Sequence, residues 1–231
     1  MKNNRKKLIK LISLKILLVS VLFIASLFIF ALIANEAVLE NEKIFDDKIF
    51  AFFSSFSTAG FIQMMKVFTF FGSSYFLLPA YLVLIGYFFI KRKPTYAIDI
   101  AIIAVSSTAL MELLKRIFHR QRPTLPIIKG ITSYSFPSGH ALSAFIFCSI
   151  LVFIVRDAVW RNTYKWMASV LLMLFALMIG VSRIALKVHY PTDVIASYCL
   201  GIVWVIVSLY LLKKMDRNYL VAKNLFSPEN G

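Results

Sequence analysis

Residues 137–155, PSGHALSAFIFCSILVFIV, join a short polar motif to an apolar run that contains no charged side chain. A helix that crosses a membrane needs roughly 20 predominantly apolar residues, and this run is close to that length. Proline, serine and glycine at the start of such a run are typical of a helix amino terminus. The stretch therefore predicts a membrane helix over residues 138–155, with its polar motif at one membrane face.

Five further apolar runs lie at residues 14–34, 75–90, 96–115, 164–181 and 192–212. The chain of 231 residues is 60% hydrophobic and has a mean hydropathy of +0.78, whereas roughly half of a soluble domain is apolar. We expect an all-α, polytopic membrane helix bundle of about six transmembrane helices, forming one domain over residues 1–231. Cys148 and Cys199 fall inside expected spans and are predicted to be small buried hydrophobic residues.

Residues 35–74, between the first two spans, have a mixed character. They open with five acidic residues and continue with aromatic and aliphatic residues at near-helical spacing. This pattern predicts amphipathic helices that lie in the membrane interface. A lid packed on the helix bundle explains the pattern equally well. Either arrangement could shape the entrance for a lipid.

The net charge of +15 is unevenly distributed over the expected topology. Placing both terminal tails, the adjoining Lys15 and the turns near residues 91–93 and 156–165 on one side collects 16 of the 26 Lys and Arg residues there. Cytoplasmic loops are enriched in these residues, so both tails, 1–13 and 213–231, are expected to be cytoplasmic. This asymmetry accounts for the charge without a nucleic-acid partner. The first run is longer than a signal-peptide core and lacks a cleavage motif, so we expect it to stay as an anchor.

Three polar motifs lie where expected spans begin or end, all on the outer side. Lys115 closes the span at 96–115, and Arg122 follows seven residues later in the next loop. Two cations at one interface can bind one anion, although each alone is explained by a charge that reaches the lipid headgroups. Arg116 and Arg120 lie off this pattern, and we expect that ordinary role for both.

The second motif, Ser138-Gly139-His140, opens the helix quoted above. Glycine allows a close backbone approach to an anion, Ser138 supplies a hydroxyl at the cap position, and free amides of the first turn carry positive partial charge. These features predict a phosphate site at the helix start. A capped helix start with a buried His140 is the ordinary alternative.

The third motif combines Arg183 with His189 and Asp193. If a helix starts at Pro191, the imidazole and the carboxylate are one turn apart and Asp193 can hold one ring nitrogen of His189. The other nitrogen then keeps a lone pair that can attack phosphorus. The surrounding cations should also disfavour protonation of the ring. A structural His-Asp pair is the alternative for this motif alone.

Together, Lys-x6-Arg-Pro, Pro-Ser-Gly-His and Ser-Arg-x5-His-x3-Asp resemble the signature of the phosphatidic acid phosphatase type 2 (PAP2) superfamily, over residues 115–193. The resemblance implies a lipid phosphatase that works through a phosphohistidine. His189 would be the nucleophile, Asp193 would orient it, and His140 would act as general acid and base. The residues that would bind the phosphate oxygens are Lys115, Arg122, Ser138, Gly139 and Arg183.

The resemblance implies no cofactor and no metal, and a substrate drawn from membrane lipid phosphates. Undecaprenyl pyrophosphate is expected first, since that carrier is released on the outer side, ahead of phosphatidylglycerol phosphate and phosphatidate. A lipid-phosphate scaffold or transporter without chemistry remains an alternative, as does a vanadium haloperoxidase, although those resemble larger soluble proteins. We expect His119 to be a plain loop residue and Lys187 and Tyr190 to neighbour the headgroup. The oligomeric state is open.

Overall fold

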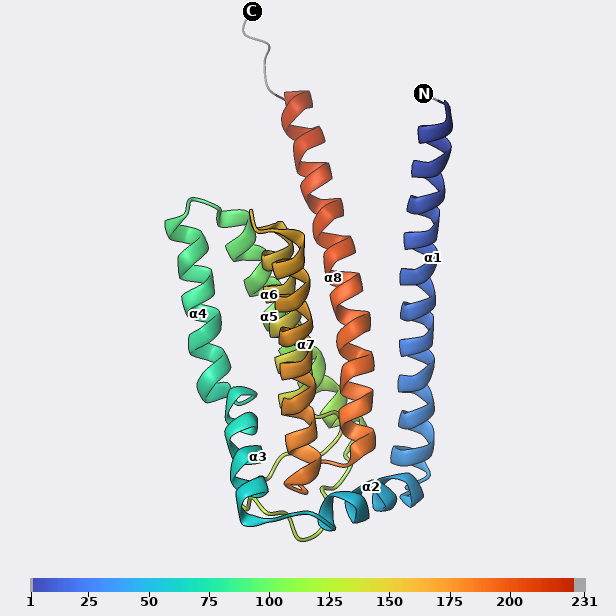
Figure 1. Ribbon diagram of the computed structural model, residues 1–231, viewed down its shortest axis with the longest axis vertical. Helices are drawn as coiled ribbons and strands as arrows, with labels where there is room; N and C mark the ends of the chain where they lie inside the picture. Colours follow the sequence, from blue (N-terminus) through green and yellow to red (C-terminus); the bar gives the residue numbers. More distant parts are fainter. Residues whose placement is uncertain (1, 227–231) are drawn as a thin grey trace, which may run out of the picture.

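The computed structural model describes the backbone of residues 2–226 and the side chains of residues 14–214. Every regular element in this part of the chain is a helix. Figure 1 shows long helices side by side, with shorter helices at one end. The elements are α1 (Lys2–Ile33), the π-helix η1 (Ala34–Leu39), α2 (Ile44–Ser54), α3 (Ala59–Phe71), α4 (Ser74–Ile90), α5 (Pro94–Phe118), α6 (Gly139–Asp157), α7 (Asn162–Ala185) and α8 (Pro191–Phe226).

Five segments within residues 2–226 are long and apolar enough to cross a membrane on their own: Leu14–Leu39, Pro94–Phe118, Gly139–Asp157, Asn162–Ala185 and Pro191–Lys214. A sixth span is reached only when α3 and α4 are counted together as one broken span. The two helices meet at a bend of 40°, where Gly72 and Ser73 interrupt the helix. The all-α membrane bundle is confirmed, but the predicted second span at 75–90 covered only one part of this pair.

The start of α1 and the end of α8 lie at the same end of the bundle, together with the α4–α5 and α6–α7 turns (Figure 1). The helices do not end where the sequence analysis separated the tails from the spans. Helix α1 already begins at Lys2, and α8 continues to Phe226. Lysine and arginine favour helix, so charge alone does not end one. Of the two expected tails, 1–13 and 213–231, the side chains of residues 1–13 and 215–231 lie outside the described residues.

The opposite end of the bundle carries α2 and the loops at 119–138 and 186–190 (Figure 1). Helix α2 runs across this end and packs against α7 and α8. Asp46 on α2 is fully buried, while Ile44, Phe45 and Phe52 are exposed. Of the two arrangements expected for residues 35–74, α2 therefore has features of both: one side packs on the bundle and the other presents apolar side chains outward.

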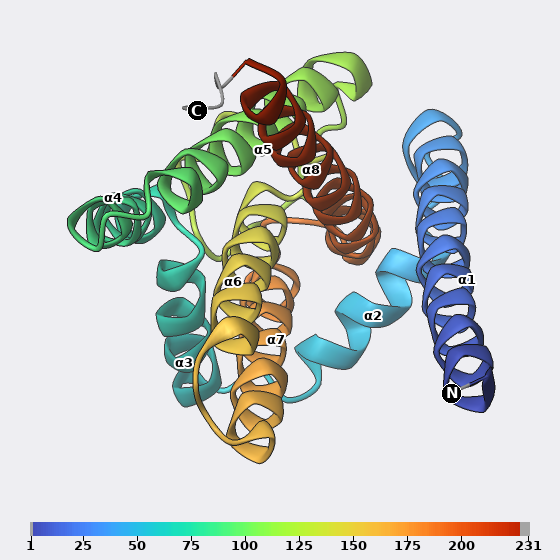
Figure 2. The same ribbon diagram turned by 90° about the horizontal axis from the view of Figure 1, so that it is seen from above.

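Helices α6, α7 and α8 form the centre of the bundle, with α1 and α4 at opposite edges (Figure 2). Leu142 and Ile146 of α6 are almost completely buried. Gly201 of α8 lies so close to the Phe145 ring that an added Cβ would be 2.6 Å from it, so only glycine permits this helix approach. This close packing between α6 and α8 sets how far the two helices are shifted along each other, and so where their polar amino ends lie.

Candidate active site

The three motifs meet at the end of the bundle that carries α2. Neighbouring helices run in opposite directions, so the carboxyl ends of α5 and α7 lie beside the amino ends of α6 and α8 (Figure 1). The last turns of α5 and α7 carry Lys115 and Arg183, and the first turn of α8 carries Asp193. All three side chains are buried, as is His189 in the α7–α8 loop. Segments that are far apart in sequence therefore supply one compact group of charged and imidazole side chains.

His189 is held between a carboxylate and a guanidinium. Its Nδ1 lies 3.4 Å from Asp193 Oδ2, and its Nε2 lies 3.1 Å from Nη1 of Arg122. A guanidinium can only donate, so Nε2 must carry the lone pair and the ring proton belongs on Nδ1, toward the carboxylate. This is the tautomer that the motif spacing predicts for a nucleophilic imidazole, and Pro191 is the first residue of α8 as expected.

Burial is the main reason why His189 stays neutral. The ring is only 1% exposed, and burial lowers its pKa to about 4. The hydrogen bond and charge of Asp193 act in the opposite direction, while the charges of Arg122 and Arg183 lower the pKa further. The cationic effect expected from the sequence is thus present, but desolvation is the larger cause.

Asp193 is fixed by donors on both carboxylate oxygens. Oδ1 accepts from Nη1 of Arg120 at 2.6 Å, and Oδ2 accepts from the backbone N–H of Tyr190 at 2.9 Å and from the hydroxyl of Ser135. The carboxylate is fully buried. A buried charge with this many donors has little freedom to rotate, so the orientation of His189 is set before any substrate binds.

The expectation that Arg120 extends to the lipid headgroups is wrong. Arg120 is 6% exposed and bridges two carboxylates, Asp193 and Asp46, with Nη2 2.9 Å from Asp46 Oδ2. Its guanidinium carbon lies 4.0 Å from the centre of the Tyr190 ring, which is itself buried. Tyr190 therefore packs against Arg120 and is not the free headgroup neighbour that its position suggested. The sequence carries one usable signal, namely that Arg120 lies between the motif residues Lys115 and Arg122. Nothing in the sequence identifies Asp46 as its partner.

The predicted phosphate ligands form a second group beside His189. Lys115 is buried, and its Nζ would lie 3.9 Å from a Cβ added at Gly139. Nη1 of Arg183 donates to the Thr69 hydroxyl at 2.6 Å, while its buried Nε has no partner within residues 14–214. Because α3 contributes Thr69, the bent α3–α4 span also helps to orient this arginine.

Ser138 is the cap residue of α6, but its hydroxyl does not cap the helix. The hydroxyl is buried and has no hydrogen-bond partner in the described part of the chain. Its backbone N–H instead donates to Ser197 Oγ at 2.7 Å, and Ser197 in turn donates to the Asp193 carbonyl at 2.7 Å. The start of α6 is thereby tied to the start of α8, and the serine hydroxyl stays available to a ligand.

His140 occupies the first turn of α6, and its ring makes no hydrogen bond within residues 14–214. Gly72, at the α3–α4 bend, lies against it: an added Cβ at this glycine would be 3.2 Å from the His140 Cβ and 2.5 Å from Ile179. The break in the second span thus lets its backbone approach the Cβ and the carbonyl oxygen of His140 closely. His119 is exposed and lies edge-on to Tyr134, as expected for a loop residue.

Across residues 14–214, no group of three or more His, Cys, Asp or Glu side chains is arranged to hold a metal ion. The donors around His189 are mostly guanidinium, ammonium and hydroxyl groups, which suit an anion with several oxygen atoms.

A protein-family model described as PAP2 superfamily matches residues 96–217, more than half of the chain. The chain belongs to the PAP2 superfamily. The match contains all eight predicted site residues, from Lys115 to Asp193, whereas Asp46 and Thr69 lie outside it.

Two curated relatives have similar sequences. Phosphatidylglycerophosphatase B of Bacillus subtilis (strain 168) is 29% identical over 155 residues, which cover 67% of this chain and 74% of the relative. Undecaprenyl-diphosphatase of Sulfolobus acidocaldarius is 31% identical over 137 residues, which cover 57% of this chain and 61% of the relative.

Two crystal structures have a similar fold. The transmembrane PAP2-type phosphatidylglycerolphosphate phosphatase from Bacillus subtilis has a TM-score of 0.73 and 26% identity, covering 85% of this chain and 96% of that one. The structure of Aquifex aeolicus LpxE has a TM-score of 0.56 and 27% identity, and the match covers 71% of this chain and 93% of LpxE. The chain is thus a multi-pass membrane protein of the PAP2 superfamily, related to phosphatases.

Proposed function

We propose that this PAP2 protein hydrolyses the phosphate or pyrophosphate ester of a membrane lipid through a phosphohistidine on His189, without a metal ion. One observation carries the proposal. The His189 lone pair and the Arg122 guanidinium are 3.1 Å apart, while the other ring nitrogen faces Asp193. A phosphoryl group bound by Arg122 would therefore lie next to a nucleophile that is already oriented.

The reaction then has two steps. Nε2 of His189 bonds to phosphorus as the bond from phosphorus to the leaving oxygen breaks, and His140, in its imidazolium form, gives a proton to that oxygen and becomes neutral. Neutral His140 next takes a proton from water, whose oxygen attacks phosphorus and displaces His189 as inorganic phosphate forms. Lys115, Arg122 and Arg183 stabilise the charge on the non-bridging oxygens in both steps.

The charge distribution supports an active site on the outer face of the membrane. The turns at 91–93 and 156–165, the start of α1 and the end of α8 lie at the end of the bundle opposite to the α7–α8 loop that contains His189 (Figure 1). Those segments hold the excess of Lys and Arg, which favours the cytoplasmic side. The proposed reaction therefore takes place in the outer leaflet, with both termini in the cytoplasm.

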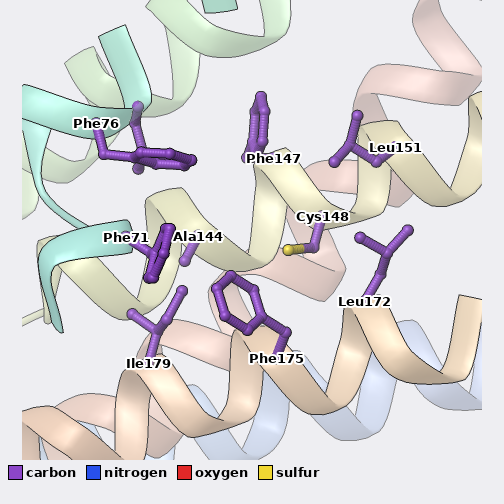
Figure 3. A pocket seen from close by; sticks show the side chains of 10 residues that line it. Phe71, Phe76, Ala144, Phe147, Cys148, Leu151, Leu172, Phe175 and Ile179 are labelled. Carbon is purple, nitrogen blue, oxygen red and sulfur yellow. The ribbon is translucent and has the colours of Figure 1, made fainter. Parts of the chain in front are cut away.

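An apolar cavity of about 170 Å³ next to the site supports a lipid substrate (Figure 3). It lies between the α3–α4 pair, α6 and α7, and its lining residues are Phe71, Phe76, Leu77, Ala144, Phe147, Cys148, Leu151, Leu172, Phe175 and Ile179. Ala144 lies one helical turn from His140, and Ile179 one turn from Arg183. A lipid whose phosphate contacts these two polar residues could place the first part of its tail in the cavity.

Two substrates deserve the first tests. The proposed outer site favours an isoprenoid pyrophosphate such as undecaprenyl pyrophosphate. The longer sequence match to phosphatidylglycerophosphatase B and the higher TM-score of the related phosphatase structure favour phosphatidylglycerol phosphate.

The test is phosphate release by the purified protein in detergent, with these two lipids and phosphatidate, in the presence of EDTA. We expect release from at least one lipid and none from the His189→Ala variant. Lipid binding without release would support the scaffold alternative. Loss of activity in EDTA that Mg²⁺ restores would contradict the metal-free reaction.

The cavity is tested in the same assay by substitution of two adjacent residues on α6. Cys148 lines this cavity, whereas Ser149 lines a separate one at the other side of the helix, beside α5 and α8. Cys148→Phe should lower kcat/KM for long-chain lipids by about tenfold, the equivalent of roughly two buried methylene groups, and should spare a short-chain phosphatidate. Ser149→Phe is the matched control; equal losses on long and short chains would remove the cavity from the proposal.

A further inference from the structure

Asp46 is a buried carboxylate at the site, contributed by a segment outside the family match. It belongs to the first turn of α2 and is fully buried against the first turn of α8. Oδ1 accepts from the backbone N–H of Thr192 at 2.9 Å, and Oδ2 accepts from the Thr192 hydroxyl at 2.8 Å and from Nη2 of Arg120 at 2.9 Å. The carboxylate thus contacts a residue adjacent to Asp193.

The contacts of Asp46 favour its ionised form. Both oxygens accept hydrogen bonds, from a backbone amide, a hydroxyl and a guanidinium, and a proton on the carboxyl would occupy one of the acceptor positions. Burial is the largest effect on the pKa of Asp46 and leaves it above its ordinary value, while the Thr192 hydrogen bonds and the Arg120 charge act in the opposite direction. A buried guanidinium between two carboxylates is the arrangement that keeps all three groups charged.

The charges of this cluster explain why a second carboxylate is useful. Arg120 contacts Asp193 at 2.6 Å, so alone it would neutralise the negative charge that His189 needs. The proposed reaction places positive charge on the His189 ring when Nε2 bonds to phosphorus, and this charge is stabilised by a nearby anion. With Asp46 on the other side of Arg120, the cluster of Asp46, Arg120 and Asp193 retains a net charge of −1.

We infer that Asp46 is a positioning residue of the phosphatase reaction, which compensates the charge of Arg120 so that Asp193 remains an effective counter-ion of His189. The inference rests on the proposed function of His189 as the nucleophile. It also assigns a role to the segment between the first two spans. Helix α2 supplies this charge, although Asp46 and its partner Thr192 are 146 residues apart in the sequence.

A purely structural role makes different predictions. Thr192 is in the first turn of α8, where backbone N–H groups have no partner inside the helix, so Asp46 also caps this helix. Loss of a cap alone would lower stability and leave the affinity of the correctly folded molecules for phosphate unchanged. Loss of a negative charge makes the site more positive, so it should bind phosphate as well as before or more tightly while turnover falls.

The experiment compares Asp46→Asn with Asp47→Asn. The two residues are adjacent on α2, but Asp47 is exposed, so its variant removes the same charge without touching the cluster. For Asp46→Asn we expect kcat, measured per correctly folded molecule on the monodisperse size-exclusion fraction, to fall by about tenfold or more, while the inhibition constant of inorganic phosphate stays the same or decreases. A purely structural role would leave this kcat unchanged. The inhibition constant does not depend on how many molecules are folded. The Asp47→Asn variant should match the wild type in both.

A double variant keeps the inference testable if Asp46→Asn folds poorly. Asp46→Asn with Arg120→Gln removes one negative and one positive charge, so the cluster keeps its net charge of −1 and Asp193 keeps its own. We expect this double variant to recover at least part of the kcat lost in Asp46→Asn.

The inference is overturned by any of three results: a kcat for Asp46→Asn within about twofold of Asp47→Asn, a phosphate inhibition constant that increases, or a double variant slower than the single one. Failure of the proposed function looks different, because the wild-type protein would then release no phosphate from any lipid in the panel, or His189→Ala would retain turnover.

Discussion

The site has two halves that differ in how their polar groups are bonded. Around His189, both ring nitrogens have a partner, and both oxygens of Asp193 accept hydrogen bonds. Around His140, the ring makes no hydrogen bond to the described part of the chain. The Ser138 hydroxyl and Arg183 Nε are buried without a partner within residues 14–214.

This difference corresponds to two different tasks. A nucleophile gains from an orientation that is set before reaction, since no free energy is then spent on reorganising it in the transition state. Groups that bind and protonate a substrate must keep donors available for it. A buried donor without a partner costs about 1–3 kcal/mol, and a bound phosphate could remove this cost. We expect substitutions in the two halves to have different kinetic effects.

The largest effect should separate the two histidines. His189→Ala removes the group that bonds to phosphorus, so turnover should fall by more than about a thousandfold and no phosphoenzyme should form. His140→Ala keeps the nucleophile but loses both the acid for the leaving oxygen and the base for water. With an ester whose leaving group needs no protonation, such as a nitrophenyl phosphate, only the second step should slow, so phosphohistidine should accumulate. Rapid-quench trapping with this ester, labelled on phosphorus, measures both. Equal amounts of trapped phosphoenzyme in the two variants would contradict the assignment of roles.

A smaller effect should separate two serines. Ser138→Ala removes a hydroxyl without a partner, so the melting temperature should not fall, while the inhibition constant of phosphate should rise about fivefold, equivalent to one hydrogen bond. Ser197→Ala removes the hydroxyl that joins the starts of α6 and α8, so it should lower the melting temperature. If Ser138→Ala destabilises the protein as much as Ser197→Ala, the hydroxyl has a structural role.

The smallest effect concerns stability against acid. The pKa of His189 is lowered to about 4, mainly by burial, whereas an imidazole in an unfolded chain titrates near 6.5. Between these values the unfolded chain binds a proton that the folded protein does not, so stability falls as the pH decreases through this window. Melting temperatures measured from about pH 7 to about pH 4 should decrease less steeply for His189→Gln than for the wild type. Parallel curves would mean that the folded protein accommodates the imidazolium.

Local patterns in the sequence were sufficient for five of the six spans, and they nominated eight candidate site residues, whose roles stay a prediction. Hydropathy over about 20 residues identifies a membrane helix, and fixed spacing places Lys115, His140 and His189 at span ends on one side. The broken span was missed because α4 alone has 17 residues, and the 40° bend at Gly72 depends on packing against His140 and Ile179.

The partners of the buried charges were determined only by the tertiary structure. Arg120 lies four residues after Arg116 in one basic stretch, and both would be assigned to the headgroup region, yet Arg120 is buried between Asp193 and Asp46, 73 and 74 residues away. A buried charge must be paired, and its partner is whichever opposite charge the packed helices bring within about 3 Å. The sequence by itself therefore determined the membrane fold and the chemical groups of the site. The packing of α2 across the bundle decided which acid neutralises Arg120, because that contact depends on three-dimensional position and not on spacing along the chain.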